Sequence, residues 1–429
     1  MQLIKYPKRE DWATLLKRPS FDNSSLTETV SGILNDVRTR GDKAVKEYEL
    51  KFDKVNLTSL AVSEAEINEA EALVSAELKN AIRQAKENIA KFHSAQDQPL
   101  PCVETMPGVK CWQKAKAIQK VGLYIPGGTA PLFSTVLMLA VPAKIAGCRD
   151  IILCTPPDKT TGKVNPAVLF AAQVAGVNRI FKIGGVQAIG AMAYGTESVP
   201  KVYKIFGPGN QFVTAAKQIV SLKDVAIDMP AGPSEVEVIA DETANPEFVA
   251  ADLLSQAEHG ADSQAILITS SEELAENVMT EVEKQLAVLP RLALAEKSIA
   301  NSRIIVVKNL EEVIDITNEY APEHLIISTK NYMDIAERIE NAGSLFLGHL
   351  TPESAGDYAS GTNHTLPTSG YAHAYSGVNL DSFRKKMTYQ EITPEGVKNI
   401  AQTVEIMAEN EQLFAHKNAM TLRKLKQLK

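Results

Sequence analysis

The chain contains few cysteines for its length, with four in 429 residues. No two of them have C-x-x-C spacing, so the sequence predicts neither a disulfide framework nor a thiolate zinc site. We therefore interpret all four as free thiols: Cys102, Cys111, Cys148 and Cys154.

The sequence also lacks a long apolar run and a block of like charges. Residues 1–11 carry charges where a secretory signal peptide would need apolar residues, and no stretch approaches the length of a membrane span. The formal net charge is −7, and the lysines at the C-terminus are too few for a basic arm. These features argue against a nucleic-acid or membrane partner, so we expect a cytoplasmic protein with a small, dissolved substrate.

A dinucleotide-binding G-x-G-x-x-G fingerprint, with an acidic residue at the expected distance, is absent as well. The sequence has instead a repeated pattern of strand, turn and helix. Its four predicted strands are residues 118–124, 150–155, 179–183 and 201–206. This repeat predicts an α/β fold with a parallel, doubly wound sheet.

Ligands of such sheets lie beyond the carboxyl ends of the strands, where Tyr124, Gln187 and Asn210 fall beside glycine-rich turns. These glycines serve either nucleotide binding or only the tight packing of strands on helices. The residues alone leave both interpretations open.

A chain of this length, with 45% hydrophobic residues, predicts two to four domains. The N-terminal fifth has helical patterns, and the third predicted helix is long, continuing to Phe92 after a capping box at Ser63 and Glu66. The second half resumes the alternation and predicts a second sheet with strands at residues 236–240, 265–269, 303–307, 325–327 and 344–347.

Sequence after about Leu380 is predicted to be helical throughout. Its last element, residues 396–429, is amphipathic and has no sheet of its own to cover. Such a tail has to dock on another surface, and another subunit is one candidate.

Residues 354–367 combine acid, imidazole, amide and hydroxyl groups between glycines. Gly356 and Gly361 interrupt both the helical and the strand period, so Asp357 and His364 are predicted to lie on bent backbone. Loops of this kind tend to carry function, although an ordinary polar turn would have a similar composition.

Gln256 and His259 are spaced by three residues at a predicted helix end, which places both on one face. A lone histidine there can simply interact with the helix dipole. Asp357 and His364, together with His416 in the tail, could supply the further oxygen and nitrogen donors of a zinc site with open positions.

Glu323 and His324 follow Pro322 at the start of a predicted strand, where both side chains can line a cleft. Histidine suits a base near neutral pH, and an adjacent carboxylate can orient it or activate water. A surface Glu-His pair is the alternative. The remaining histidines, which lack such neighbours, are interpreted as structural or exposed: His93, His349 and His373.

Six motifs taken together resemble those of the histidinol dehydrogenase family, in the family's order and with no departure at a functional position. The motifs are G-L-Y-I-P-G-G-T-A-P-L from residue 122, F-G-P-G-N from 206, M-P-A-G-P-S-E from 229, S-Q-A-E-H-G from 255, A-P-E-H-L from 321 and G-D-Y-A-S-G-T-N-H from 356. The resemblance extends from the N-terminal helices to A-H-K-N-A from residue 415.

This resemblance implies a zinc- and NAD-dependent enzyme of histidine biosynthesis. Such an enzyme oxidises L-histidinol, through an aldehyde that it retains, to L-histidine in two hydride transfers. Zinc would position the substrate, His324 would take the hydroxyl proton, and Glu323 would activate water for the second oxidation. A zinc hydrolase and a non-catalytic ligand-binding protein are the alternatives from other classes, and neither would use all these features.

The resemblance also implies two incomplete Rossmann-like domains with small helical segments at both ends. The expected divisions are an N-terminal helical segment 1–21, a first domain of 22–125 with 234–379, an NAD-side domain 126–233, and a helical tail 380–429 that docks on the partner of a homodimer.

Several site residues follow from the same resemblance. The implied zinc ligands are Gln256, His259, Asp357 and His416, and the implied NAD contacts are Tyr124, Gln187 and Asn210. The implied substrate contacts are Ser234, His364 and Glu411, and the zinc ligands and His324 are implied to contact the substrate as well.

Overall fold

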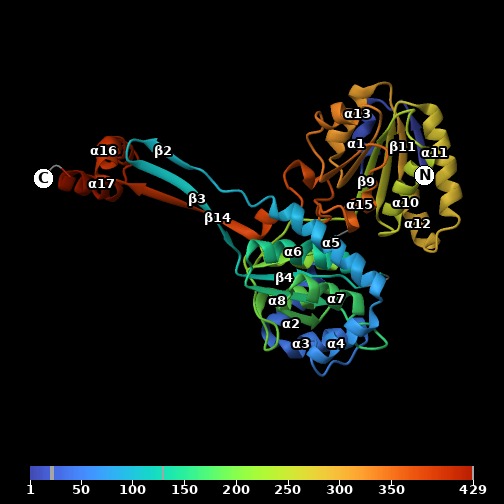
Figure 1. Cartoon of the computed structure of the whole chain (residues 1–429), viewed down its shortest axis with the longest axis horizontal. Helices are drawn as coiled ribbons and strands as arrows, with labels where there is room; N and C mark the ends of the chain where they lie inside the picture. Colours follow the sequence, from blue (N-terminus) through green and yellow to red (C-terminus); the bar gives the residue numbers. More distant parts are fainter. Residues whose placement is uncertain (20–23, 128–129, 428–429) are drawn as a thin grey trace. The chain divides into compact units, whose positions relative to one another are not determined.

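The computed structural model describes residues 1–19, 24–127 and 130–427, so Gly128 of one predicted turn lies outside it. The chain forms two compact units (Figure 1). The first combines Met1–Ser94 with Ile118–Phe383, and the second combines Ala95–Ala117 with Arg384–Lys429. None of the described helices is both long and apolar enough to cross a membrane.

The first unit contains a five-stranded parallel sheet in the order β6-β5-β4-β7-β8. Its strands are β4 (Lys120–Tyr124), β5 (Asp150–Thr155), β6 (Arg179–Lys182), β7 (Lys204–Phe206) and β8 (Ala226–Ile227). The four predicted strands of this sheet are confirmed. From β4 the chain adds β5 and β6 on one side of that strand, and then adds β7 and β8 on the opposite side. The strand order therefore reverses between β4 and β7, and ligands of such sheets bind at this reversal.

Helices cover both faces of this sheet. The helices between its strands are α6 (Phe133–Ala146), α7 (Pro166–Ala175), α8 (Gly185–Tyr194) and α9 (Gln211–Ser221). The N-terminal helices are α2 (Ser24–Arg40), α3 (Asp42–Tyr48), α4 (Glu64–Leu73) and α5 (Ala76–Ser94). The core beside α5, α6 and α7 is separate from the core beside α2, α8 and α9.

This packing differs from the predicted divisions. Strand β4 and helices α2–α5 belong with the five-stranded sheet, whereas residues 22–125 were expected to accompany 234–379. The capping box of Ser63 and Glu66 is confirmed at the start of α4. The predicted long helix is two helices, because the backbone at Val74 is extended and the Ser75 hydroxyl accepts a bond from the Leu78 amide of α5.

The first unit also contains a six-stranded parallel sheet in the order β1-β11-β10-β9-β12-β13. Its strands are β1 (Gln2–Lys5), β9 (Glu235–Ala240), β10 (Gln264–Thr269), β11 (Arg303–Val306), β12 (His324–Ser328) and β13 (Ser344–Leu347). The second predicted sheet is confirmed. The N-terminal segment is not purely helical as expected, because β1 pairs with β11 ahead of the short helix α1 (Trp12–Leu15).

The helices α10 (Pro246–Ala257), α11 (Glu272–Leu286) and α12 (Leu292–Ala300) lie beside this sheet in Figure 1. The later helices are α13 (Leu310–Tyr320), α14 (Tyr332–Ala336) and α15 (Glu353–Tyr358). The chain order again reverses, here between β9 and β12. In the register of these two strands, His324 lies opposite Val236, next to Glu235.

The second unit is a three-stranded antiparallel sheet with two helices. Its strands, in the order β14-β3-β2, are β14 (Arg384–Ile392), β3 (Val109–Ala117) and β2 (Cys102–Met106). The prediction of helix throughout this tail is wrong for β14. Helices α16 (Pro394–Asn410) and α17 (Phe414–Gln427) are separated at Gln412, which has a positive φ of 60°.

Candidate active site

His324 is the first residue of β12 and is buried, with 2% of its surface exposed. Its Nδ1 lies 3.2 Å from the backbone oxygen of Glu235. A carbonyl oxygen only accepts hydrogen bonds, so in the neutral ring Nδ1 carries the proton and Nε2 keeps its lone pair. Nε2 has no hydrogen-bond partner among the described residues and lies 3.6 Å from Asp357 Oδ1.

Three carboxylates surround this imidazole. Besides Asp357, one oxygen each of Glu323 and Glu353 lies 3.7 Å from Nδ1. Burial opposes the charged ring, but these carboxylates outweigh it and hold the pKa of His324 well above its usual value. Burial raises the pKa of Glu323 to about 8 and that of Glu353 to about 8.

Glu323 is 5% exposed, so the alternative of a surface Glu-His pair is wrong. One of its carboxylate oxygens accepts a hydrogen bond of 2.9 Å from the backbone amide of Glu235. The pair is thus fixed from β9 and lies inside the first unit.

A cluster of possible metal ligands adjoins the pair. Ligand atoms of His259, Glu353 and Asp357 all lie within 4.8 Å of one another. Gln256 on α10 is fully buried, yet neither polar atom of its amide has a partner among the described residues. Only the amide oxygen can bind a cation, and a buried acceptor without a partner is costly, so this donor set fits a cation that Gln256 Oε1 would bind.

The predicted site loop begins as the short helix α15 and continues as irregular chain. Asp357 lies on α15, while His364 follows it, with Nδ1 3.0 Å from the Asp357 backbone oxygen and Nε2 3.2 Å from Thr135 Oγ1 of α6. His364 is half-buried, as is Ser234, which directly precedes β9. Asp357, but not these two residues, belongs to the candidate metal cluster.

The two tail residues lie in the second unit. Glu411 follows α16, His416 lies on α17, and both side chains are exposed. The candidate metal cluster of the described residues does not include His416. The roles of both residues therefore stay predictions.

The predicted NAD contacts lie at the carboxyl ends of the five-stranded sheet. The Tyr124 hydroxyl, at the end of β4, accepts a 3.1 Å bond from the Gly185 amide. Gln187 on α8 is buried and donates through Nε2 to Glu49 over 2.8 Å, while its Oε1 has no partner among the described residues. Asn210 caps α9 by accepting from two backbone amides.

This edge also holds Glu49, which the sequence interpretation missed. Its carboxylate accepts bonds from the Gly184 amide and from Gln187, and burial raises its pKa to about 8. Through this contact Glu49 fixes the orientation of the Gln187 amide. This leaves Gln187 Oε1 as a buried acceptor without a partner among the described residues.

Comparison with known proteins identifies the family. The sequence profile of histidinol dehydrogenases matches residues 16–424. The chain belongs to the histidinol dehydrogenase family. The histidinol dehydrogenase of Bacteroides thetaiotaomicron is 69% identical over 423 residues, 99% of either chain, and that of Salmonella typhimurium is 56% identical over 417 residues, 96% of this chain and 95% of that protein.

A solved histidinol dehydrogenase shares the whole fold. The crystal structure from Elizabethkingia anophelis superposes with a TM-score of 0.97 at 55% sequence identity, covering 100% of this chain and 98% of that one. The predicted fold class is confirmed. A zinc-dependent hydrolase, the alternative considered from the sequence, is not supported.

Gly207, in a family motif directly after β7, tests how tightly this edge is built. Its φ is +127°, and a Cβ there would lie 2.0 Å from the backbone oxygen of Tyr124. We expect Gly207→Ala to lower the free energy of unfolding by roughly 3 kcal/mol, through strain and overlap with fixed backbone. Urea unfolding measures this loss.

The matched control is Gly32→Ala, because Gly32 lies within helix α2 with nothing within 4 Å of an added Cβ. That substitution should stabilise by roughly 0.5–1 kcal/mol. Equal unfolding midpoints for the two variants would contradict the prediction.

Proposed function

We propose that this protein oxidises L-histidinol to L-histidine through L-histidinaldehyde held in one site, with reduction of two NAD⁺, as the last steps of histidine biosynthesis. The observation that carries the proposal is the contact between the buried pair Glu323–His324 and the cluster of His259, Glu353 and Asp357. Family membership makes histidinol the expected substrate.

The cation is proposed to be one Zn²⁺ per subunit, held by Gln256, His259, Asp357 and the partner's tail residue His416. The unpartnered amide of Gln256 and the convergence of His259 with Asp357 support this assignment. When bound, the ion would hold the imidazole and amine of histidinol and offset the negative charge of the carboxylates that raise the pKa of His324. Glu353, which also reaches the cluster, is the ligand candidate that the sequence interpretation missed.

His324 is proposed to act as the base of the first oxidation. Because Nδ1 donates to the Glu235 carbonyl, Nε2 is the atom that accepts the hydroxyl proton of histidinol. The carbinol carbon then releases its hydride to NAD⁺, which gives the aldehyde. Asp357, 3.6 Å from Nε2, stabilises the resulting imidazolium.

Glu323 is proposed to act in the second oxidation. Its buried carboxylate, once ionised, takes a proton from water as the water oxygen attacks the aldehyde carbon. The hydrate loses its C–H hydride to a second NAD⁺ and becomes the carboxylic acid. A pKa near 8 makes this carboxylate a stronger base than an exposed one.

NAD⁺ is proposed to bind at the carboxyl ends of the five-stranded sheet, against Tyr124, Gln187 and Asn210. The reversal of strand order between β4 and β7 supports this position. The proposed contacts that orient the substrate are Ser234, His364 and Glu411.

A cytoplasmic location of the protein stays a prediction.

Absorbance of reduced nicotinamide tests the proposal directly. Adding histidinol to the zinc-loaded protein with NAD⁺ should yield two NADH and one histidine for each histidinol consumed. Formation of only one NADH for each histidinol consumed would contradict the proposal that the enzyme retains the aldehyde and oxidises it further. Absence of any NADH would overturn the proposed activity.

The tail is proposed to complete the site of the partner in a homodimer. We expect His259→Ala and His416→Ala to be inactive separately and to regain activity when their subunits are exchanged. In a mixed dimer both lesions then fall in one site and leave the other intact, so random pairing leaves about a quarter of all sites whole.

Activity of the mixture measures this result, and differently tagged chains that elute together verify the exchange. If the tail instead served its own subunit, every site would carry one lesion. Verified exchange without recovered activity would therefore contradict the shared site.

A further inference from the structure

The backbone of Glu235 contacts both members of the proposed acid–base pair. Its amide donates to the Glu323 carboxylate over 2.9 Å, and its carbonyl oxygen lies 3.2 Å from His324 Nδ1. The position of this single residue, the first of β9, therefore sets the orientation of both catalytic side chains.

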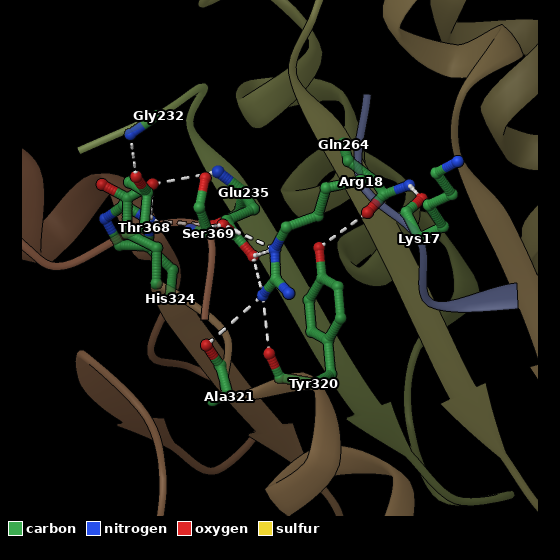
Figure 2. Close-up of polar contacts among 11 residues, drawn as sticks. Lys17, Arg18, Gly232, Glu235, Gln264, Tyr320, Ala321, His324, Thr368 and Ser369 are labelled. Carbon is green, nitrogen blue, oxygen red and sulfur yellow. Dashed lines mark hydrogen bonds and ion pairs between the residues drawn. The ribbon is translucent and has the colours of Figure 1, made fainter. Parts of the chain in front are cut away.

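The side chain of Glu235 is fixed in turn by Arg18 (Figure 2). Arg18 Nε lies 3.0 and 2.8 Å from the two carboxylate oxygens, and a terminal nitrogen of the guanidinium bonds to the same group over 2.5 Å. The Ser369 amide donates to this carboxylate as well. Glu235 is only 2% exposed, so water competes little for these bonds.

Arg18 also holds the chain on the other side of the pair. Its guanidinium donates to the Tyr320 backbone oxygen over 2.6 Å and to that of Ala321 over 3.5 Å, and it lies 4.0 Å from the centre of the Tyr320 ring. Ala321 has a positive φ of 50°, which is unfavourable for a residue with a Cβ. The guanidinium therefore stabilises a strained turn that directly precedes Pro322, Glu323 and His324.

Arg18 itself is anchored through its neighbour in the N-terminal segment. The Lys17 backbone oxygen accepts a bond of 3.4 Å from Gln264 Nε2, and Gln264 Oε1 accepts one of 2.9 Å from the Tyr320 hydroxyl. One side chain from the N-terminal segment thus connects β9 with the α13–β12 turn, which leads directly into the pair.

We propose that Arg18 is a positioning residue for the oxidation chemistry, which acts through Glu235 and Ala321 on Glu323 and His324. The expected change in kcat rests on the proposed function. The expected change in the orientation of Glu323 and His324 does not. If the Arg18–Glu235 ion pair only stabilised the fold, a change in the geometry of that ion pair would leave the orientation of His324 unchanged.

The kinetic test compares Arg18→Lys and Arg18→Met with Arg9→Met. Arg9 lies in the same segment but pairs with the exposed Asp315, so its loss does not reach the site. Lysine keeps the charge but not the planar fork. We expect both Arg18 variants to lose about 10- to 100-fold in kcat, because displacement of a reacting group by about 1 Å costs about that much.

The KM for NAD⁺ should stay within about twofold, and Arg9→Met should behave as the parent. An unchanged kcat in Arg18→Lys and Arg18→Met would overturn the proposal. Should Arg18→Met fail to fold, Arg18→Lys and Glu235→Gln, which nearly preserves the shape of that side chain, decide the question.

A spectroscopic readout separates this inference from the proposed function. In protein with ¹⁵N-labelled histidine, the Nδ1–H signal of His324, assigned by its loss in His324→Ala, reports the bond to the Glu235 carbonyl. We expect that signal to shift in Arg18→Lys and to stay in place in Arg9→Met. A shift would support the positioning role even if histidinol were not the substrate, whereas identical spectra would overturn it.

Discussion

Removal of the metal is expected to abolish the oxidation of histidinol, and added zinc is expected to restore it. The proposed ligands are one amide, one carboxylate and two histidines without any thiolate, so the ion is held largely by geometry and can be extracted. Two donors of this set lie on buried parts of the first unit, Gln256 and Asp357. Without the ion, Gln256 Oε1 and Asp357 Oδ1 have no partner among the described residues, and the substrate lacks its anchor.

Elemental analysis and turnover, measured on the same sample before and after chelation, check this result. Binding of NAD⁺ should persist after chelation, because its proposed contacts lie on the other sheet. His259→Ala should lose both zinc and activity. His349→Ala is the matched control, since His349 contacts Thr243 and Ser328 outside the cluster. Full activity in a preparation without metal would refute the zinc assignment.

The parallel sheets could be predicted because their strands are short apolar runs that alternate with helices and turns. Strand β14 carries mainly charged and polar side chains and is largely exposed, so no apolar period distinguishes it from a helix. It is a strand because it pairs with β3 from Val109 to Ala117, a partner far away in the sequence. The strand propensity and local pattern of residues 384–392 do not reveal that distant partner.

The candidate site shows the same division between local and distant information. Glu323 and His324 are adjacent in sequence, so residue types alone suggested their role. Glu353 was missed, although its spacing of four from Asp357 on α15 places both on one helix face, a signal that was available. Arg18 could not be found in this way, because 217 positions separate it from its partner Glu235.

The largest kinetic effects of single substitutions are expected at the acid–base pair, and they should divide between the two half-reactions. His324→Ala removes the group that accepts the hydroxyl proton, so oxidation of histidinol should slow by about a hundred- to ten-thousand-fold. Glu323→Gln keeps the shape of the side chain but cannot take a proton from water. It should slow oxidation of the aldehyde more than oxidation of the alcohol, because only the aldehyde has to be hydrated.

Supplying histidinal as the substrate isolates the second half-reaction, and stopped-flow detection of the first NADH isolates the first. Glu319→Gln is the matched control, since Glu319 is an exposed residue of the preceding helix α13. It should leave both rates unchanged. Both pair members contact the Glu235 backbone, so a general disturbance of the site would lower both rates together. Equal losses in the two assays for Glu323→Gln would therefore contradict its assignment as the base that activates water.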